Sequence, residues 1–227
     1  MLYGAREQRK RKEDTMNVAG NDRNPQTDPV LMQAVQEQPV RASLTSLGQL
    51  SVLSVVRTVD APPEHVWALL TQPHQVALWS PITPSRALDS LGLATTQEDP
   101  QQPPVLADVL AAQTGKLLCH RWGQDTLRWE LSAKISAETD KTTLALQHSF
   151  TDVAMASSLA AGWHICLAAL SLRSTGQQVD RPVGRRAMDY GWEKLMLTYA
   201  DLLEVPAAQS CPAWPAYSGN CRMGTLA

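Results

Sequence analysis

Three of the five histidines lie in apolar stretches, where an imidazole could transfer a proton near neutral pH. His148 alternates with Leu146 and Phe150, so we expect it on the apolar face of a strand. There it either lines a cavity and orients a ligand or is a hydrogen-bonded core residue. His120 falls in a second alternating stretch, and His164 falls in a stretch of helical period. Convergence of the three side chains would place a polar spot inside an apolar pocket.

Three tryptophans accompany these histidines. Trp122 and Trp129 lie on expected strands, and Trp163 directly precedes His164. Inward-facing indoles are either plain core or the walls of a cavity, because they combine a large apolar surface with one N–H donor. We therefore predict a ligand-binding site made of histidines, aromatic residues and one leucine, namely His120, Trp122, Trp129, Leu131, His148, Phe150, Trp163 and His164.

The sequence lacks the common catalytic and cofactor motifs. It contains no GxSxG, HExxH, GxxxxGKS/T or GxGxxG pattern, so acyl-transfer, zinc-hydrolase and nucleotide chemistries lose support. His164 and Cys166 are two positions apart on a helix and point in different directions, which argues against a thiol–base pair. Cys119, Cys166, Cys211 and Cys221 include no CxxC pair and are expected to be free thiols, with a disulfide or weak metal site between Cys211 and Cys221 as the alternative. We predict no catalytic residue, no metal and no cofactor.

The composition of the 227-residue chain is that of an ordinary globular protein, with 44% hydrophobic and 19% charged residues. A formal net charge of -2 creates no field that would gather nucleic acid or an anionic membrane, so we expect neither partner. Apolar runs are shorter than the roughly 20 residues of a membrane-spanning helix. Because the N-terminus also has no signal-peptide core, the expected compartment is the cytoplasm.

The elements that would position these residues start with a strand and two short helices. A β-branched run predicts a strand over residues 50–59. The prolines at 62–63 suit the entry of a helix, which Pro73 ends. A second helical turn over residues 75–79 would carry Trp79 into the core.

Antiparallel strands are expected next. Alternation of apolar and polar residues predicts strands over residues 126–135 and 142–151, and shorter strands over 105–110 and 116–122. The intervening segment 81–104 contains five prolines and predicts loops. The long strands carry their apolar residues on one face, so the sheet needs a cover on that face.

A late helix is able to cover that face. After Asp152 the apolar period changes to about 3.6, which predicts a long helix that ends before Gly176. A further helix is expected over residues 185–203. The order predicts an α+β fold, in which a curved antiparallel sheet wraps around a long C-terminal helix, with two short helices after the first strand and an extra C-terminal helix.

The chain is expected to have three regions. Residues 1–45 are polar, with scattered prolines, and are predicted to be a disordered or loosely attached N-terminal extension. Residues 46–205 form the folded domain. Residues 206–227 are rich in proline, glycine and serine and are expected to be a flexible tail.

The order and spacing of several segments resemble the START-like superfamily, also called SRPBCC. These segments are RTVDAPPEHVWALLTQP followed by Trp79, the paired strands WGQDTLRWELS and TTLALQHSFTD, then AAGWHICLAAL and YGWEKLMLTYADLL. They are most similar to bacterial members of the branch that resembles the C-terminal domain of the activator of the 90-kilodalton heat-shock protein ATPase. The resemblance spans about residues 48–204 and implies the helix-grip fold. Nothing in residues 1–45 resembles the separate N-terminal domain of that activator.

The resemblance and the residues together support three functional hypotheses. The preferred one is a non-enzymatic module that binds a small hydrophobic molecule between sheet and long helix, or a chaperone or other protein partner at the rim, with a stress- or chaperone-related role as one option. The second is an aromatase- or cyclase-type enzyme acting on a polyketide-like substrate, with His148 or His164 as acid or base. The third is a co-chaperone that stimulates a heat-shock ATPase.

Overall fold

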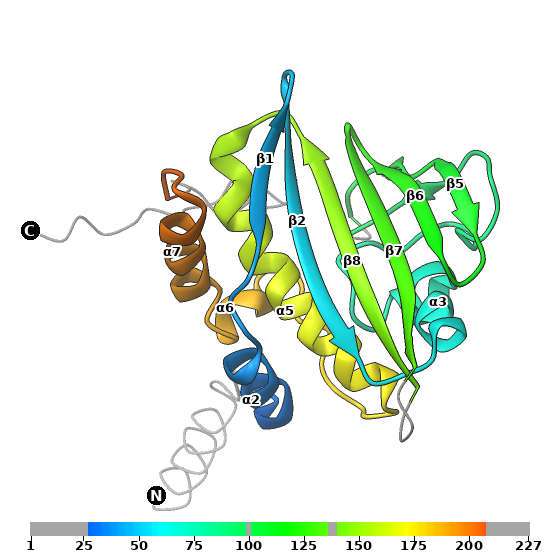
Figure 1. The fold of residues 1–227 in the computed structure, drawn as a ribbon, viewed down its shortest axis with the longest axis horizontal. Helices are drawn as coiled ribbons and strands as arrows, with labels where there is room; N and C mark the ends of the chain where they lie inside the picture. The colour runs from blue at the N-terminus through cyan, green and yellow to red at the C-terminus, as the bar shows by residue number, and fades with distance from the viewer. Residues whose placement is uncertain (1–26, 99–100, 136–139, 208–227) are drawn as a thin grey trace, which may run out of the picture.

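The computed structural model describes residues 27–98, 101–135 and 140–207, and these form one antiparallel sheet with helices against it (Figure 1). The six-stranded sheet has the order β1-β2-β8-β7-β6-β5. Its strands are β1 (Ser43–Leu47), β2 (Leu50–Val59), β5 (Val109–Gln113), β6 (Leu117–Trp122), β7 (Asp125–Ile135) and β8 (Asp140–Phe150). A separate pair is formed by β3 (Thr95–Thr96) and β4 (Val105–Leu106).

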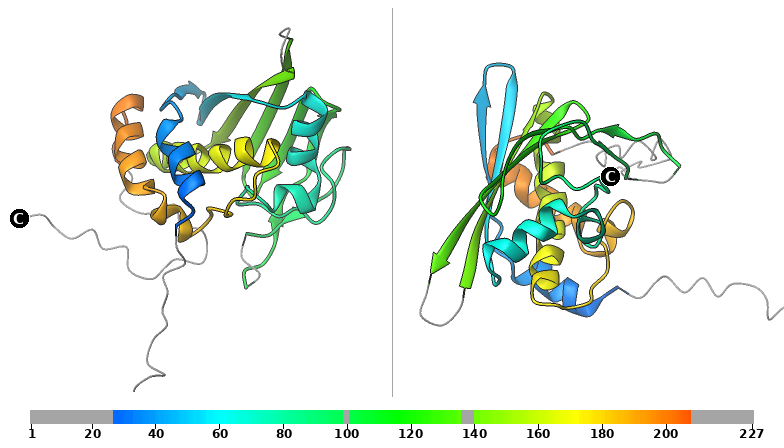
Figure 2. Two further views of the ribbon diagram at one scale, coloured as in Figure 1. Left: turned by 90° about the horizontal axis from the view of Figure 1, so that it is seen from below. Right: turned by 90° about the vertical axis from the view of Figure 1, so that its right-hand side faces the viewer.

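The helices pack on one face of this curved sheet (Figure 2). They are α2 (Pro29–Glu37), α3 (Pro63–Thr71), α4 (Pro73–Val76), a single 3-10 turn η1 (Val153–Met155), α5 (Ala156–Ser174), α6 (Arg186–Asp189) and α7 (Trp192–Leu203). The predicted α+β helix-grip architecture is confirmed, with α5 as the long helix that the sheet wraps.

The apolar face predicted for the central strands is the buried one. Leu127, Trp129 and Leu131 of β7 are at most 6% exposed. Trp129 pairs with Leu146 across the β7–β8 ladder, and Leu127 pairs with His148. The alternation therefore set both the register and the face that meets α5.

Helix α5 is buried on nearly every side, because the sheet covers one side while α2 and α7 pack on others. One helical stretch, Val153–Ser174, has the length and apolar composition of a membrane span, and 72% of its apolar window lies buried inside the fold. The sequence was expected to hold no run of this length. The core position of the helix accounts for its apolar character.

Two short helices follow β2 as expected, although the second, α4, spans Pro73–Val76 and not residues 75–79. Pro62 is the N-cap of α3 and Pro63 its first residue. The Trp79 indole N–H donates to the Leu69 carbonyl at 2.9 Å, and its ring meets that of Trp129 edge-on at 6.0 Å. Trp79 thus pins the end of the helix pair into the core.

The structure corrects the prediction for the described part of residues 1–45. Residues 27–45 are not loosely attached, because α2 and most of β1 lie there. Leu31 and Val35 of α2 are buried, and Asp28 caps the helix. A helix-start signal was present, because Asp28 precedes Pro29 and the four-residue spacing of Leu31 and Val35 fits one helix face, but the segment is short and the residues around it are polar with scattered prolines.

Two further boundaries differ from expectation. The helix expected over residues 185–203 is divided into α6 and α7, because Gly191 adopts a left-handed φ of 80°. The strand expected over residues 105–110 is divided between β4 and β5. Cys211, Cys221 and residues 208–227 of the expected tail lie outside the described residues.

Candidate functional site

A cavity of about 190 Å³ lies beside the N-terminal half of α5. Its walls come from α5, the β6–β7 turn, the connector from α5 to α7, and two residues of the proline-rich segment. The apolar lining consists of Pro81, Trp122, Met155, Leu159, Gly162, Trp163, Cys166, Pro182, Val183, Gly184, Ala187, Met188 and Trp192. Three lining residues have polar side chains, namely Glu98, Asp125 and Ser158. A mostly apolar hollow with a few converging polar groups is typical of a small-molecule site.

Two of the eight residues predicted for a binding site line this cavity. Trp122 ends β6 and Trp163 lies on α5, and their rings meet edge-on with centroids 5.9 Å apart. The other six predicted residues lie behind the wall or elsewhere in the core. The cavity therefore sits at one end of the sheet, while the middle of the sheet packs directly against α5 through residues such as Trp129.

His148 lies behind the cavity wall and holds two lining residues. Its Nδ1 accepts from the Trp163 indole N–H at 3.1 Å, and an indole is only a donor. The proton of the neutral ring is therefore on Nε2, which donates to Asp125 Oδ2 at 3.0 Å. The side chain is fully buried and both ring nitrogens are engaged. His148 is thus a positioning residue for Trp163 and Asp125.

His120 is a core residue in the structure. Its Nδ1–H donates to the Arg121 carbonyl at 2.9 Å, and its Nε2 accepts from the Trp129 indole at 3.4 Å. Burial lowers the pKa of His120 to about 4, so the ring is neutral near pH 7. Neither His120 nor Trp129 lines the cavity.

His164 points away from the cavity. Its Nε2–H donates to the Val35 carbonyl at 3.0 Å, and its Nδ1 accepts from the Tyr199 hydroxyl at 2.9 Å. The ring thereby joins α2, α5 and α7, and burial lowers its pKa to about 4. The three histidines do not converge, since consecutive positions on a helix face different neighbours and Trp163 takes the cavity side.

Leu131 and Phe150 are buried in the core without lining the cavity. The Phe150 ring packs edge-on against His148, with centroids 5.5 Å apart. Leu131 pairs with Leu144 across the β7–β8 ladder. Phe150 therefore packs behind the site through His148, whereas Leu131 belongs to the core between β7 and β8.

Glu98 is one of two acidic lining residues that are absent from the predicted set. Its Oε1 accepts from the Trp122 indole N–H at 2.7 Å. Its Oε2 is buried and has no hydrogen-bond partner among the described residues. Burial raises the pKa of Glu98 to about 7, against the opposing effects of the Trp122 bond and of Arg181. An isolated acid in a proline-rich loop gives no periodic signal, so only its contact with Trp122 identifies it.

Asp125 is also absent from the predicted set, because it falls between the strands expected over residues 116–122 and 126–135. It is the cross-strand partner of Trp122 at the β6–β7 turn, which brings its carboxylate to the cavity. Its side chain is 31% exposed. The available sequence signal was an acidic residue three positions after Trp122, at the start of the next strand.

Cys166 lines the cavity but is not activated. Burial raises the pKa of its thiol to about 12, which keeps it protonated and weakly nucleophilic. The described residues contain no group of three or more His, Cys, Asp or Glu side chains placed to hold a metal ion. The polar chemistry of the cavity is therefore that of two carboxylates and a hydroxyl.

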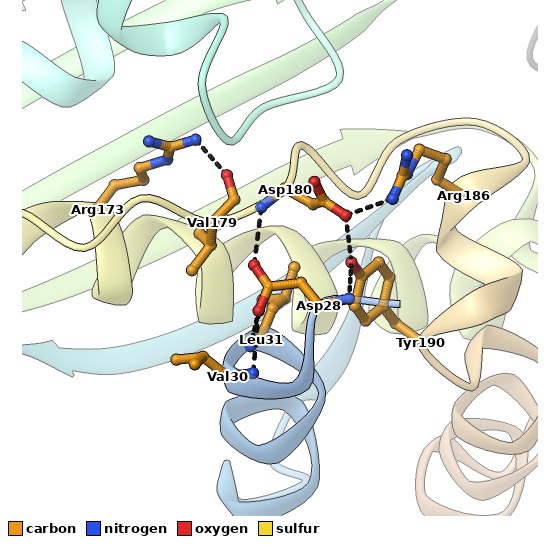
Figure 3. A network of polar contacts seen from close by, with 8 residues as sticks. All are labelled: Asp28, Val30, Leu31, Arg173, Val179, Asp180, Arg186 and Tyr190. Carbon is orange, nitrogen blue, oxygen red and sulfur yellow. Dashed lines mark hydrogen bonds and ion pairs between the residues drawn. The ribbon is translucent and has the colours of Figure 1, made fainter. Parts of the chain in front are cut away.

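A polar network fastens the outer wall of the cavity to α2 (Figure 3). Asp28 Oδ2 accepts from the Asp180 backbone N–H at 3.2 Å. The Tyr190 hydroxyl accepts from the Asp28 N–H at 3.2 Å and donates to Asp180 Oδ2 at 3.0 Å. Arg186 forms an ion pair with Asp180. The connector held in this way supplies the lining residues between 182 and 188.

The chain is similar to one protein family and to several proteins of known structure. A family model described as "Activator of Hsp90 ATPase homolog 1-like protein" matches residues 60–173. No curated protein matches the chain. The structure of EF2215, a conserved protein of unknown function from Enterococcus faecalis, has a TM-score of 0.59 at 16% identity and covers 75% of this chain and 94% of that chain. The crystal structure of CalU16 from Micromonospora echinospora has a TM-score of 0.51 at 18% identity and covers 71% of this chain and 95% of that chain. These two likenesses show the fold.

Proposed function

The chain belongs to the activator of Hsp90 ATPase homolog 1-like family, within the START-like superfamily, and we propose that it is a non-catalytic module that binds one small, largely apolar molecule in the cavity beside Trp163. Family and fold support a ligand-binding module in general. The finer proposal rests on one observation, which is the cavity of about 190 Å³ with tryptophan walls and three polar side chains.

The size of the cavity limits the ligand. Drug-sized ligands occupy pockets of roughly 300–1,000 Å³, whereas a hollow of about 150 Å³ accepts benzene. A cavity of about 190 Å³ therefore suits a molecule of about one ring with a short substituent.

The contacts of the histidines favour binding over histidine catalysis. A general base needs a nitrogen within reach of the substrate. Both nitrogens of His148 are engaged by Trp163 and Asp125, and both nitrogens of His164 are engaged by Val35 and Tyr199. The co-chaperone hypothesis rests on the family description alone, so we propose the binding module.

Gly162 provides a sharp test, because it lines the cavity and a Cβ added there meets no atom within 4 Å. Gly162→Leu should fill the cavity, while Gly162→Ala is the matched control with almost unchanged space. Ligand-observed NMR with a set of single-ring aromatic compounds should show binding to the wild type and to Gly162→Ala. Binding should be lost in Gly162→Leu.

Thermal unfolding checks that both variants fold. Gly162→Ala should raise the free energy of unfolding by about 1 kcal/mol, because alanine is favoured over glycine inside a helix. If no compound binds the wild type, or if a folded Gly162→Leu variant binds as well as the wild type, the cavity is not the binding site.

A further inference from the structure

We propose that the cavity selects a small organic cation, an ammonium group carried on an apolar body of about one ring. This inference rests on the proposed function and names its ligand class. It depends on three features of the lining, which are its charge, its unpaired acceptors and its aromatic walls.

The charge of the lining has one sign. Glu98 and Asp125 line the cavity, and no lysine, arginine or histidine is among the described residues that do. Arg181 lies outside this lining and keeps its positive charge, which lowers the pKa of Glu98 against the larger effect of burial, and the guanidinium donates to neutral acceptors. Its Nε donates to the Ser80 carbonyl at 2.8 Å, and one terminal nitrogen donates to the Pro81 carbonyl at 2.9 Å and to the Thr83 hydroxyl at 3.2 Å. A cationic ligand would neutralise the carboxylates, whereas an anionic ligand would be repelled.

Two polar groups of the lining lack partners. Ser158 is fully buried, and its Oγ has no hydrogen-bond partner among the described residues. Oε2 of Glu98 is also buried and has no hydrogen-bond partner among the described residues. Buried polar atoms are nearly always paired in native proteins, so these two oxygens are acceptors available to a ligand donor that reaches them. An ammonium brings N–H donors that could satisfy both oxygens.

Indole rings form the remaining wall. Trp122, Trp163 and Trp192 all line the cavity, and the first two are 5.9 Å apart between centroids. Tryptophan is the strongest aromatic partner for a cation, and desolvation inside a cavity increases that attraction. The Trp122 indole N–H also donates to Glu98, so the carboxylate and the ring lie next to each other in the lining and could contact the same ligand cation.

Proton linkage adds an independent signature. The pKa of Glu98 is raised to about 7 in the free protein, and a bound cation would favour its ionised form. The affinity for a cation should therefore rise with pH up to about 7 and level off above it. A neutral ligand of the same shape should show no such rise.

The experiment compares three probes of similar size by isothermal titration calorimetry on the full chain at pH 8. Benzylamine is the cation, benzyl alcohol the neutral analogue and benzoate the anion. We expect benzylamine to bind at least about tenfold more tightly than benzyl alcohol, from one cation–π and one charge-assisted contact. Benzoate should bind most weakly.

Two variants assign the preference to the lining. Glu98→Gln keeps the acceptor for Trp122, and Asp125→Asn keeps an acceptor for His148, so both should fold. Each should reduce the preference for benzylamine over benzyl alcohol, and Glu98→Gln should also remove the pH dependence. Glu130→Gln is the matched control, because Glu130 is exposed beside Arg128 and does not line the cavity.

Other outcomes overturn the inference without touching the proposed function. Equal affinity for benzylamine and benzyl alcohol, or an unchanged preference in Glu98→Gln, would rule out cation selection while leaving a binding cavity. Failure of all three probes would overturn the ligand class. The Gly162 pair would still decide the proposed function with uncharged compounds.

Discussion

Glu98 is the residue on which the chemistry of the site depends. It combines a bond to Trp122 with an unpaired buried oxygen, and burial raises its pKa to about 7. An acid whose pKa is raised on folding binds its proton more tightly in the native state than in the unfolded state. The associated stability is present below pH 4.5 and is lost as pH rises through about 7.

Glu98→Gln should therefore stabilise the ligand-free protein in a pH-dependent way. At pH 8 the wild type must bury an ionised carboxylate and the variant buries a neutral amide. We expect a higher free energy of unfolding for the variant at pH 8, on the order of 1–3 kcal/mol, and little difference at pH 4.5. Urea unfolding at the two pH values measures this. A constant difference across that range would contradict the raised pKa.

Some residues of the candidate site could be predicted from the sequence and others could not. Trp122 and Trp163, which line the cavity, could be predicted to face inward because large apolar side chains follow the strand and helix periods. Glu98 and Asp125 were missed, because loop residues carry no period and their placement depends on contacts distant in sequence. His148 was correctly predicted on the apolar face. Its hydrogen bonds to Trp163 and Asp125 could not be predicted, because alternation along a strand does not specify partners that are distant in sequence.

At the scale of elements, strong periods were predicted well and short elements were not. The strand at residues 50–59 was predicted with the bounds that β2 has, and the alternation of β7 and β8 gave the correct buried face. Helix α2 was not predicted, because this nine-residue amphipathic segment lies between polar stretches with scattered prolines, which favoured an unstructured extension. The division of α6 from α7 follows from the backbone of Gly191, which composition does not encode.

Helix α2 has a structural role that Asp28 makes testable. Asp28 Oδ1 accepts from the backbone N–H groups of Val30 and Leu31, and Oδ2 accepts from that of Asp180. Asparagine caps helices as well as aspartate, but its Nδ2 cannot accept a hydrogen bond. Asp28→Asn therefore removes only the link to the connector, while Asp28→Ala removes the cap as well.

We expect Asp28→Asn to be less stable than the wild type and Asp28→Ala to be less stable than Asp28→Asn. Asp28→Asn should cost about 1 kcal/mol for one hydrogen bond, and Asp28→Ala about 1 kcal/mol more for the lost cap. Chemical unfolding gives both values. Equal stability of the two variants would mean that the cap contributes nothing, and a wild-type value for Asp28→Asn would mean that the link in Figure 3 does not stabilise the fold.

At the scale of the whole molecule, α5 separates two polar centres with different tasks. On its cavity side, Trp163 binds His148 and faces the hollow. On its other side, His164 bonds to α2 and α7 through Val35 and Tyr199. The neutral imidazole of His164 therefore joins three helices, α2, α5 and α7.

This arrangement predicts acid sensitivity of the whole fold. The folded-state pKa values of His164 and His120 are lowered to about 4, from about 6.5 in the unfolded chain. The unfolded state therefore binds more protons between these values, and the stability they provide above pH 6.5 is lost as pH falls towards 4. Each shift corresponds to roughly 3 kcal/mol.

His164→Phe in a Glu98→Gln background isolates this effect, because Glu98 titrates in the same range with the opposite sign. The double variant should be less stable than Glu98→Gln at pH 7, since the bonds to Val35 and Tyr199 are lost. It should, however, lose roughly 3 kcal/mol less stability between pH 7 and pH 4, since phenylalanine takes no proton. Urea unfolding at half-unit pH steps measures both slopes. Equal slopes would show that His164 titrates normally in the folded protein and would contradict its role as the neutral junction of α2, α5 and α7.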